Sequence, residues 1–160
     1  MNIALVGYGK MGRIIESTAL SRGHQVPVKI DIDNPQDWNQ IKPGQVDVAI
    51  EFTGPHSAFD NLVKCMENGV PVVSGSTGWL EKFGVIEELC REKNGSFLYA
   101  SNFSVGVNIF FEVNKRLATL MATQPEYEVS ITEIHHTQKK DAPSGTAITI
   151  AEQILESLPR

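Results

Sequence analysis

Short apolar runs alternate with amphipathic stretches along residues 1–100 of the chain. Five of these runs are rich in β-branched and aromatic residues and are bounded by Gly, Pro, Asn or Asp, which is typical of buried strands. The predicted strands are residues 2–6, 26–31, 46–52, 70–74 and 97–100. Strands that alternate with helices predict a doubly wound parallel sheet, with helices on both of its faces.

The stretches between these strands place apolar residues at helical spacing, so each predicted helix has one face toward the sheet. The faces consist of Met11, Ile14, Ile15 and Thr18 in the first helix, Leu62, Val63 and Met66 in the next, and Phe83, Ile86, Leu89 and Cys90 in the third.

The pattern changes after Ala100. A helix that carries Phe110, Phe111 and Leu117 leads to Pro125, and residues 127–136 then alternate apolar and polar, as in a strand with one solvated side. A final helix follows the polar loop. We therefore predict two domains, residues 1–124 and residues 125–160, the second being the start of an α+β domain. One strand and one helix are too few to close a core.

Composition narrows the possible functions. The 160 residues include 14 Lys plus Arg and 19 Asp plus Glu, which gives a net charge of -5, and 41% of residues are hydrophobic. Such a chain can bury a core, and its acidic balance argues against a nucleic-acid partner. No apolar run is long enough for a membrane span. Cys65 and Cys90 are expected to be free thiols, consistent with a cytoplasmic location.

A glycine-rich turn follows the first predicted strand. Residues 7–12 have the G-x-G-x-x-G pattern, at the junction between strand and helix where it binds dinucleotides. The first glycine permits a tight turn, the second lets the backbone approach a pyrophosphate, and the third lets helix and strand pack closely. The alternative is a glycine turn without a ligand. We predict a Rossmann-type dinucleotide-binding domain with cofactor contacts at Gly7, Tyr8, Gly9, Lys10, Met11 and Gly12.

Asp31 ends the second predicted strand, at the distance from the glycine loop where a carboxylate meets the adenosine ribose. A carboxylate accepts hydrogen bonds from the 2′-hydroxyl of NAD and repels the 2′-phosphate of NADP. No arginine follows Asp31, so we expect NADH or NADPH as cofactor, with NADH favoured. Asp33 is the competing carboxylate. Lys10 and Arg13 are cations, and their charge is compatible with the 2′-phosphate of NADPH.

Two further loops follow later strands, at the sheet edge where open α/β sheets bind ligands. Their glycines allow close approach of the backbone, and their hydroxyl and amide groups suit a carboxamide. Taken alone, each loop is also typical of an ordinary turn. The cofactor contacts predicted here are Gly75, Ser76 and Thr77 in the first loop and Ala100, Ser101, Asn102 and Phe103 in the second.

Residues 133–147 form a polar loop before the last helix. We expect no metal site, because His135 and His136 point to opposite sides of an extended chain and no third ligand has a recognisable spacing. Ser144 is the predicted N-cap of the helix, so the first-turn N–H groups face outward toward an anion. His and Lys side chains beside such a helix start suit a small carboxylate substrate that needs a proton. A solvated loop with an ordinary cap is the alternative.

Together these segments resemble the 4-hydroxy-tetrahydrodipicolinate reductase family, also called dihydrodipicolinate reductases. The stretch E-x-H-H-x-x-K-x-D-A-P-S-G-T at 133–146 is highly specific to that family, and matching segments stand in the same order at 7–13, 75–78 and 100–108. The resemblance covers essentially the whole chain. It implies NAD(P)H-dependent reduction of a cyclic, unsaturated imine dicarboxylate to tetrahydrodipicolinate in lysine and diaminopimelate biosynthesis.

The resemblance also implies roles for single residues. His135 matches the family's proton donor and acceptor, and Lys139 matches its second proton donor. The residues that match the family's contacts to substrate carboxylates are His136, Lys139, Ser144, Gly145 and Thr146.

The chain departs from the family pattern in two ways. Many members carry one more residue in the glycine loop and an arginine after the ribose-binding acid, which bears on nucleotide preference. Members are also longer, and their additional part supplies most of the substrate domain's sheet, through which the family forms homotetramers. Two functions are therefore alternatives to the reductase. One is a dinucleotide-binding fragment without turnover. The other is a different small-molecule NAD(P) dehydrogenase, which would share the glycine loop but not the His-His segment.

Overall fold

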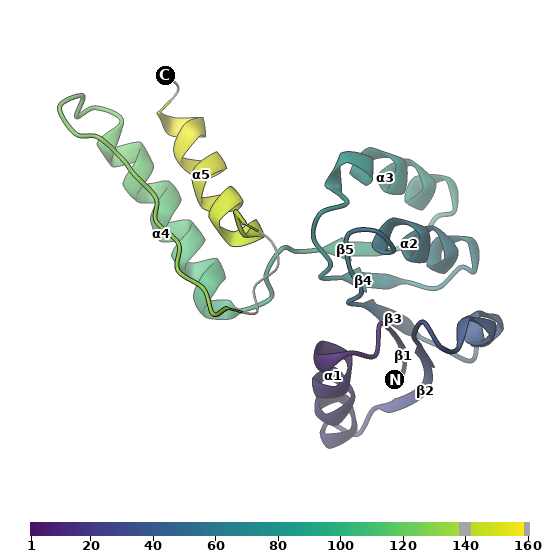
Figure 1. Cartoon of the computed structure of the whole chain (residues 1–160). Coiled ribbons are helices and arrows are strands. Elements are labelled where there is room, and N and C mark those ends of the chain that lie inside the picture. Colours follow the sequence, from purple (N-terminus) through teal and green to yellow (C-terminus); the bar gives the residue numbers. More distant parts are fainter. Residues whose placement is uncertain (138–141, 159–160) are drawn as a thin grey trace. The chain divides into compact units, whose positions relative to one another are not determined.

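The computed structural model describes residues 1–137 and 142–158. The chain forms two compact units, Met1–Ala100 and Ser101–Arg160 (Figure 1). Among the described residues, no helix has the length and apolar character needed to cross a membrane.

The first unit is built on a five-stranded sheet in which all strands are parallel, in the order β2-β1-β3-β4-β5. The strands are β1 (Asn2–Val6), β2 (Gln25–Ile30), β3 (Val48–Glu51), β4 (Val72–Ser74) and β5 (Phe97–Tyr99). Each coincides with a predicted strand to within two residues at either end, which confirms the predicted α/β sheet. The chain leaves β1 toward β2 on one side and continues through β3 on the other, so the switch point lies where β1 ends. Ligands bind at such points in open α/β sheets.

The helices of this unit cover both faces of the sheet. Alternate residues of β1 point in opposite directions, so they pack against helices on opposite faces. Ala4 and Val6 belong to one apolar cluster, which includes Leu62 and Ile86 of the second and third helices. Ile3 and Leu5 belong to another, on the side of the first helix. The helices are α1 (Lys10–Ser21), α2 (Ala58–Glu67) and α3 (Phe83–Glu92), with short 3-10 helices η1 (Pro35–Gln40) and η2 (Leu80–Lys82).

The predicted faces of α2 and α3 are confirmed. That of α1 is confirmed only at Ile15, which packs against the cluster of Ile3 and Leu5. Met11, Ile14 and Thr18 are exposed, whereas the buried positions of α1 are Gly12 and Ala19. A side chain at Gly12 would overlap the carbonyl oxygen of Gly7. Because α1 runs close to the backbone of the loop after β1, only small residues fit on the side of the helix that faces the sheet.

The second unit pairs α4 (Val105–Met121) with α5 (Gly145–Ser157). The side-chain amide of Asn114 in α4 links the two helices, since its Nδ2 donates to the carbonyl oxygen of Ile150 at 3.2 Å and to Oε1 of Gln153 at 3.0 Å. Asn114 and Gln153 are both buried. Because α4 packs on α5, the compact units divide between Ala100 and Ser101, earlier in the chain than the predicted domain boundary at residues 124/125.

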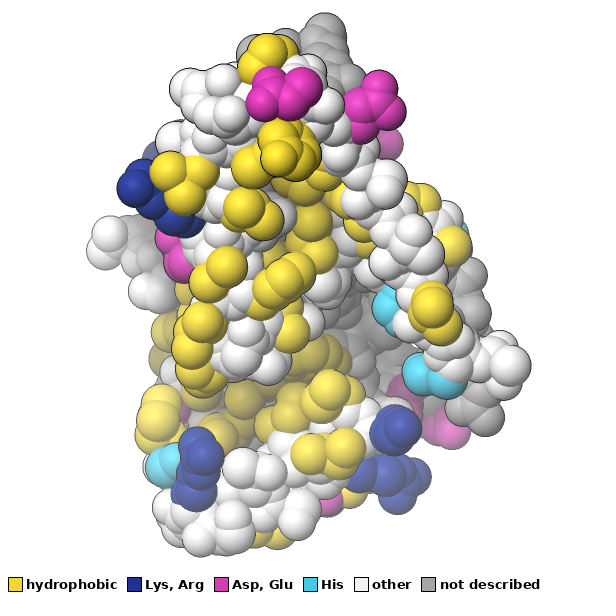
Figure 2. Space-filling view, turned by 90° about the vertical axis from the view of Figure 1, so that its left-hand side faces the viewer, with side chains coloured by type: hydrophobic (Ala, Val, Ile, Leu, Met, Phe, Trp, Pro, Cys, Tyr) yellow, Lys and Arg dark blue, Asp and Glu magenta, His cyan; other side chains and the backbone are white. Residues whose placement is uncertain are grey.

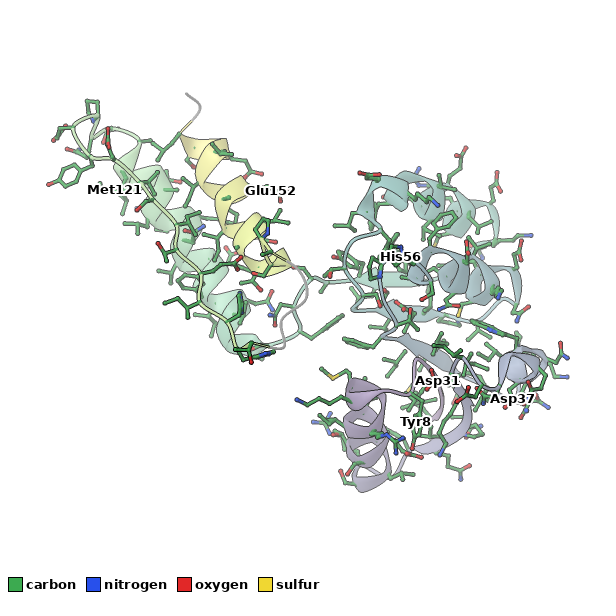
Figure 3. All side chains as sticks on the ribbon, viewed as in Figure 1. Tyr8, Asp31, Asp37, His56, Met121 and Glu152 are labelled. Carbon is green, nitrogen blue, oxygen red and sulfur yellow. The ribbon has the colours of Figure 1, made fainter. Side chains whose placement is uncertain are left out.

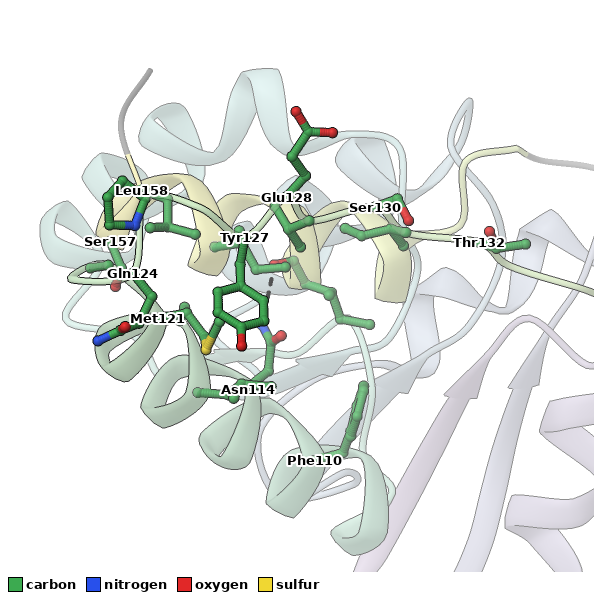
Figure 4. Close-up of a pocket in the computed structure, with 18 residues that line it drawn as sticks. Phe110, Asn114, Met121, Gln124, Tyr127, Glu128, Ser130, Thr132, Ser157 and Leu158 are labelled. Atoms are coloured by element: carbon green, nitrogen blue, oxygen red, sulfur yellow. Dashed lines mark hydrogen bonds between the residues drawn. The ribbon is translucent and has the colours of Figure 1, made fainter.

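The predicted strand over residues 127–136 is wrong, because these residues form no strand in the structure. A strand needs a neighbour for its backbone hydrogen bonds, and the described residues of this unit offer none. Residues 127–132 instead line a cavity of about 720 Å³ together with α4 and α5 (Figure 4). Apolar side chains remain exposed on this unit, among them Phe110, Tyr127 and Val129. Figure 2 shows hydrophobic side chains gathered at the surface.

Candidate functional site

The glycine loop after β1 has the geometry of a phosphate-binding turn. Gly7 adopts a φ of 95°, and a Cβ there would overlap the carbonyl oxygen of Phe52. Gly9 is the N-cap of α1, and no atom lies within 4 Å of the position that its Cβ would take. Gly7 and Gly12 are therefore required by the fold, whereas Gly9 leaves open space in front of the helix N-terminus. This is the cradle that a pyrophosphate needs.

Tyr8 is held by charged neighbours. Its hydroxyl donates to Glu16, which also accepts a hydrogen bond from Nζ of Lys29 at 2.6 Å. Arg13 and Lys29 each lie 5.0 Å from the centre of the Tyr8 ring. Lys29 and Tyr8 together lower the pKa of Glu16, Lys29 most. The network fixes the glycine loop against α1 and β2, while Lys10 and Met11 stay exposed at the start of the helix.

A cavity of about 500 Å³ lies at this end of the sheet. Gly7, Tyr8, Gly9 and Asp31 line it together with His56 from the segment after β3, and Figure 3 shows three of these side chains. The N–H of Asp31 donates to Oδ1 of Asn34 at 2.6 Å. Asp33, the competing carboxylate, does not line the cavity. The structure thus brings the glycine loop and Asp31 to one site.

The loop after β4 is packed tightly against the turn after β3. A Cβ on Gly75 would overlap the ring of Phe52. Ser76 is buried, its carbonyl oxygen accepts from Nε1 of Trp79 at 2.7 Å, and its hydroxyl donates to Glu51 at 2.8 Å. The Ser76 side chain is therefore occupied within the protein, and half-buried Thr77 is the better placed of the two side chains to meet a ligand.

The last predicted cofactor loop spans the division between the units. Ala100 ends the first unit, where its N–H donates to the carbonyl oxygen of Ser74 at 3.3 Å. Ser101, Asn102 and Phe103 begin the second unit, and Oδ1 of Asn102 accepts from the N–H of Ser104 at 2.8 Å. Phe103 is 45% exposed.

In the second unit, one carboxylate joins His135 to the start of α5. Glu133 Oε2 lies 2.8 Å from Nε2 of His135 and accepts from the hydroxyl of Ser144 at 2.6 Å, while Oε1 accepts from the Ser144 N–H at 3.0 Å. The Ser144 hydroxyl in turn accepts from the N–H of Ala147 at 3.1 Å. The predicted N-cap of α5 is thereby confirmed.

Glu133 is a residue to which the sequence analysis gave no role. Hydrogen bonds from the Ser144 hydroxyl, then from His135 and the Ser144 N–H, lower its pKa from 4.5 to about 2. It is therefore a carboxylate at neutral pH. The signal that could have found it is the spacing of two between Glu133 and His135, which puts both side chains on the same side of an extended segment.

The other predicted substrate contacts lie around the same helix start. Gly145 and Thr146 are the first residues of α5, and an α-helix leaves the N–H groups of its first turn without an intrahelical partner. His136 is exposed. Lys139 lies outside the described residues. Among residues 1–137 and 142–158, no group of three or more His, Cys, Asp or Glu side chains is arranged to hold a metal ion.

Comparison with known families gives two matches that together span the chain. The family model for the N-terminal region of dihydrodipicolinate reductases matches residues 1–103, and the model for the C-terminal region matches residues 106–160. The junction between these matches lies close to the division between the two compact units.

Individual relatives give the same result. The chain is 50% identical to the 4-hydroxy-tetrahydrodipicolinate reductase of Christiangramia forsetii over 98% of its own length and 64% of the relative's. It is 36% identical to that of Methanocaldococcus jannaschii over 94% of its own length and 48% of the relative's. A dihydrodipicolinate reductase from Paenisporosarcina sp. TG-14, solved with dipicolinate bound, superposes with a TM-score of 0.74 at 27% identity, covering 99% of this chain and 67% of that one. The chain thus spans about half to two thirds of the length of these relatives.

Proposed function

The chain belongs to the dihydrodipicolinate reductase family, and on this premise we propose that it takes part in the NAD(P)H-dependent reduction of 4-hydroxy-tetrahydrodipicolinate to tetrahydrodipicolinate. The observation that carries the proposal lies in the loop before α5, where Glu133 forms hydrogen bonds with both His135 and Ser144, the N-cap of the helix. A dinucleotide-binding domain alone would need no such arrangement. The reaction belongs to lysine and diaminopimelate biosynthesis.

The residues at the switch point fit a dinucleotide. Gly7 and Gly12 permit the tight turn, and Gly9 leaves the N-terminus of α1 open to a pyrophosphate. Asp31 lines the same cavity and supports NADH as the favoured cofactor, because its carboxylate suits a ribose hydroxyl better than a phosphate. Lys64 also lines this cavity, with its ammonium 5.0 Å from the centre of the Trp38 ring. Its positive charge is available to a 2′-phosphate, so the site is also compatible with NADPH.

The start of α5 suits a carboxylate of the substrate. Gly145 and Thr146 offer first-turn N–H groups, and the helix dipole favours an anion there. His136 and Lys139 are the proposed side-chain contacts to the dicarboxylate, and Lys139 supplies positive charge. The dipicolinate bound to the Paenisporosarcina reductase supports this class of ligand.

The proposed reaction takes up a hydride and a proton and releases the 4-hydroxyl group of the substrate as water, so that a C–H bond replaces the C–O bond and the C=N bond remains in tetrahydrodipicolinate. When bound, NAD(P)H supplies the hydride. His135 gives the proton, and Glu133 keeps its ring in place through Nε2. Lys139 is the second proton donor in this proposal. Together with the helix start, these groups balance the negative charge of the substrate during reduction.

Synthase-coupled NADH oxidation tests the proposal. The substrate is generated freshly from pyruvate and aspartate semialdehyde, and loss of NADH absorbance is followed with the chain present. Oxidation that requires the synthase supports the reductase, and oxidation without the synthase would indicate another dehydrogenase. NADH binding without oxidation would leave a nucleotide-binding fragment.

A further inference from the structure

A buried acid ends the central strand β3. Glu51 has no exposed surface, although it follows Val48, Ala49 and Ile50 in a strand that is otherwise apolar. Burying a carboxylate costs free energy unless hydrogen bonds or a charge partner compensate. None of the ion pairs among the described residues includes Glu51. Hydrogen bonds must therefore stabilise this side chain.

Four donors converge on the Glu51 carboxylate. Oε1 accepts from the Ser76 hydroxyl at 2.8 Å, from the Thr53 N–H at 2.9 Å, and from the Thr53 hydroxyl. Oε2 accepts from the Ser74 hydroxyl at 2.6 Å. The Ser76 hydroxyl also accepts from the Thr53 N–H at 2.8 Å. All these donors belong either to the turn after β3 or to the end of β4 and the loop that follows it.

The two segments that Glu51 joins border the candidate cofactor site. Thr53 lines the cavity that contains Gly7 and Asp31, and Ser76 lies in the loop predicted to reach the carboxamide. Phe52 fills the space between them, with its carbonyl oxygen against Gly7 and its ring against Gly75. A change in the turn after β3 would therefore move both glycine-containing loops.

We propose that Glu51 is a positioning residue that holds the turn after β3 and the loop after β4 in the arrangement that binds the dinucleotide. The inference rests on the proposed function, since it assumes that these loops bind NAD(P)H. An apolar residue would fill this place in the strand at lower cost, and a polar residue that breaks the strand pattern is expected where a site requires it. Glu51 touches no ligand in this account and acts through Thr53 and Ser76.

The test compares NADH binding, measured by fluorescence titration, in the full chain and its Glu51→Gln variant. Glutamine has nearly the same shape as glutamate, but its NH₂ group is a donor where glutamate has a second acceptor oxygen. The donors from Thr53, Ser74 and Ser76 can then no longer all find an acceptor. We expect its dissociation constant for NADH to rise about tenfold or more, since losing a hydrogen bond to a charged group has an effect of that size. Ile86→Val is the control, because Ile86 is fully buried in α3 and does not line the cavity.

A double-mutant cycle with Ser76→Ala separates positioning from direct contact. If Glu51 acts through Ser76, the single variants each weaken binding and the double variant is no weaker than Glu51→Gln alone. Additive losses, or binding by Glu51→Gln within twofold of the parent chain, would overturn the inference. Should Glu51→Gln fail to fold, Ser76→Ala with unchanged thermal unfolding and unchanged NADH affinity would overturn it as well. If the parent chain binds no NADH while it is folded, the proposed function fails and the inference fails with it.

Discussion

Glu133 and His135 are joined by a 2.8 Å hydrogen bond between Oε2 and Nε2. An ionised carboxylate can only accept, so the proton of this bond belongs to Nε2 of the imidazole. In the proposed reaction, Nδ1 is then the ring atom that takes up or gives the proton. Because the same carboxylate binds Ser144, the proposed proton donor and the proposed carboxylate site are both held by Glu133.

Replacing His135 by asparagine should lower turnover without changing NADH affinity. General acid catalysis typically contributes a factor of about 100 to 10,000, and we expect a loss in kcat of that order. Glu133→Ala should give a smaller loss, because the imidazole remains but is no longer oriented. Steady-state rates and NADH titration measure both effects, and unchanged turnover in His135→Asn would rule out the proton-donor role.

The stability of the second unit should depend on Glu133 at acid pH. Its pKa is about 2 in the folded chain against an ordinary 4.5, so its stabilising effect is complete above pH 4.5 and is lost as the pH falls toward 2. Thermal unfolding is followed by circular dichroism at pH 6 and at pH 3.5. On going from pH 6 to pH 3.5, the midpoint temperature should fall further in the parent chain than in Glu133→Gln. Glu112→Gln is the control, since the ion pair that Glu112 forms with Lys115 is exposed. Equal decreases in all three chains would contradict this assignment.

Two glycines of the same loop should respond differently to alanine. Gly7→Ala should destabilise the fold by at least about 1–3 kcal/mol, because φ is positive there and the Cβ overlaps the Phe52 carbonyl. Gly9→Ala should fold normally, since the space around it is open, but the added methyl group should block a phosphate and weaken NADH binding. Urea unfolding and NADH titration distinguish the two effects. Normal NADH binding by Gly9→Ala would place the pyrophosphate elsewhere.

Asp31 should determine the choice between NADH and NADPH. Asp31→Ser removes acceptors for the ribose hydroxyls and the charge that repels a 2′-phosphate, so NADH should bind about tenfold more weakly while NADPH binds more tightly. Asp33→Ser is the matched control, because Asp33 does not line the cavity. The ratio of the two dissociation constants is the quantity to measure. If Asp33→Ser shifts that ratio instead, Asp33 is the ribose-binding acid.

The sheet could be predicted from sequence because its strands are buried on both faces and appear as short apolar runs between turns. The face of α1 could not, because close packing at Gly12 and Ala19 depends on backbone distance rather than on hydrophobicity. The segment 127–136 has a strand pattern, but pairing depends on a partner that no local pattern supplies. Hydrophobic period alone therefore identifies a candidate strand and not its neighbour.

The candidate sites could be predicted only in part, for a similar reason. Spacing to strand ends and helix starts, which is local in sequence, predicted Gly7 and Asp31 as site residues, and the family resemblance predicted His135. Glu51 and Glu133 were not assigned, because their importance comes from partners far along the chain, Ser76 and Ser144 respectively. Hydrogen-bond networks of this kind become visible only when the fold brings their donors together.

The most direct test of the reductase assignment follows the hydrogen itself. The chain is incubated with NADH carrying deuterium at both C4 positions and with substrate supplied by the synthase, and the product is analysed by mass spectrometry. Our account predicts tetrahydrodipicolinate with one deuterium, and little or none with His135→Asn. A folded chain that binds NADH but transfers no deuterium to this product would contradict it.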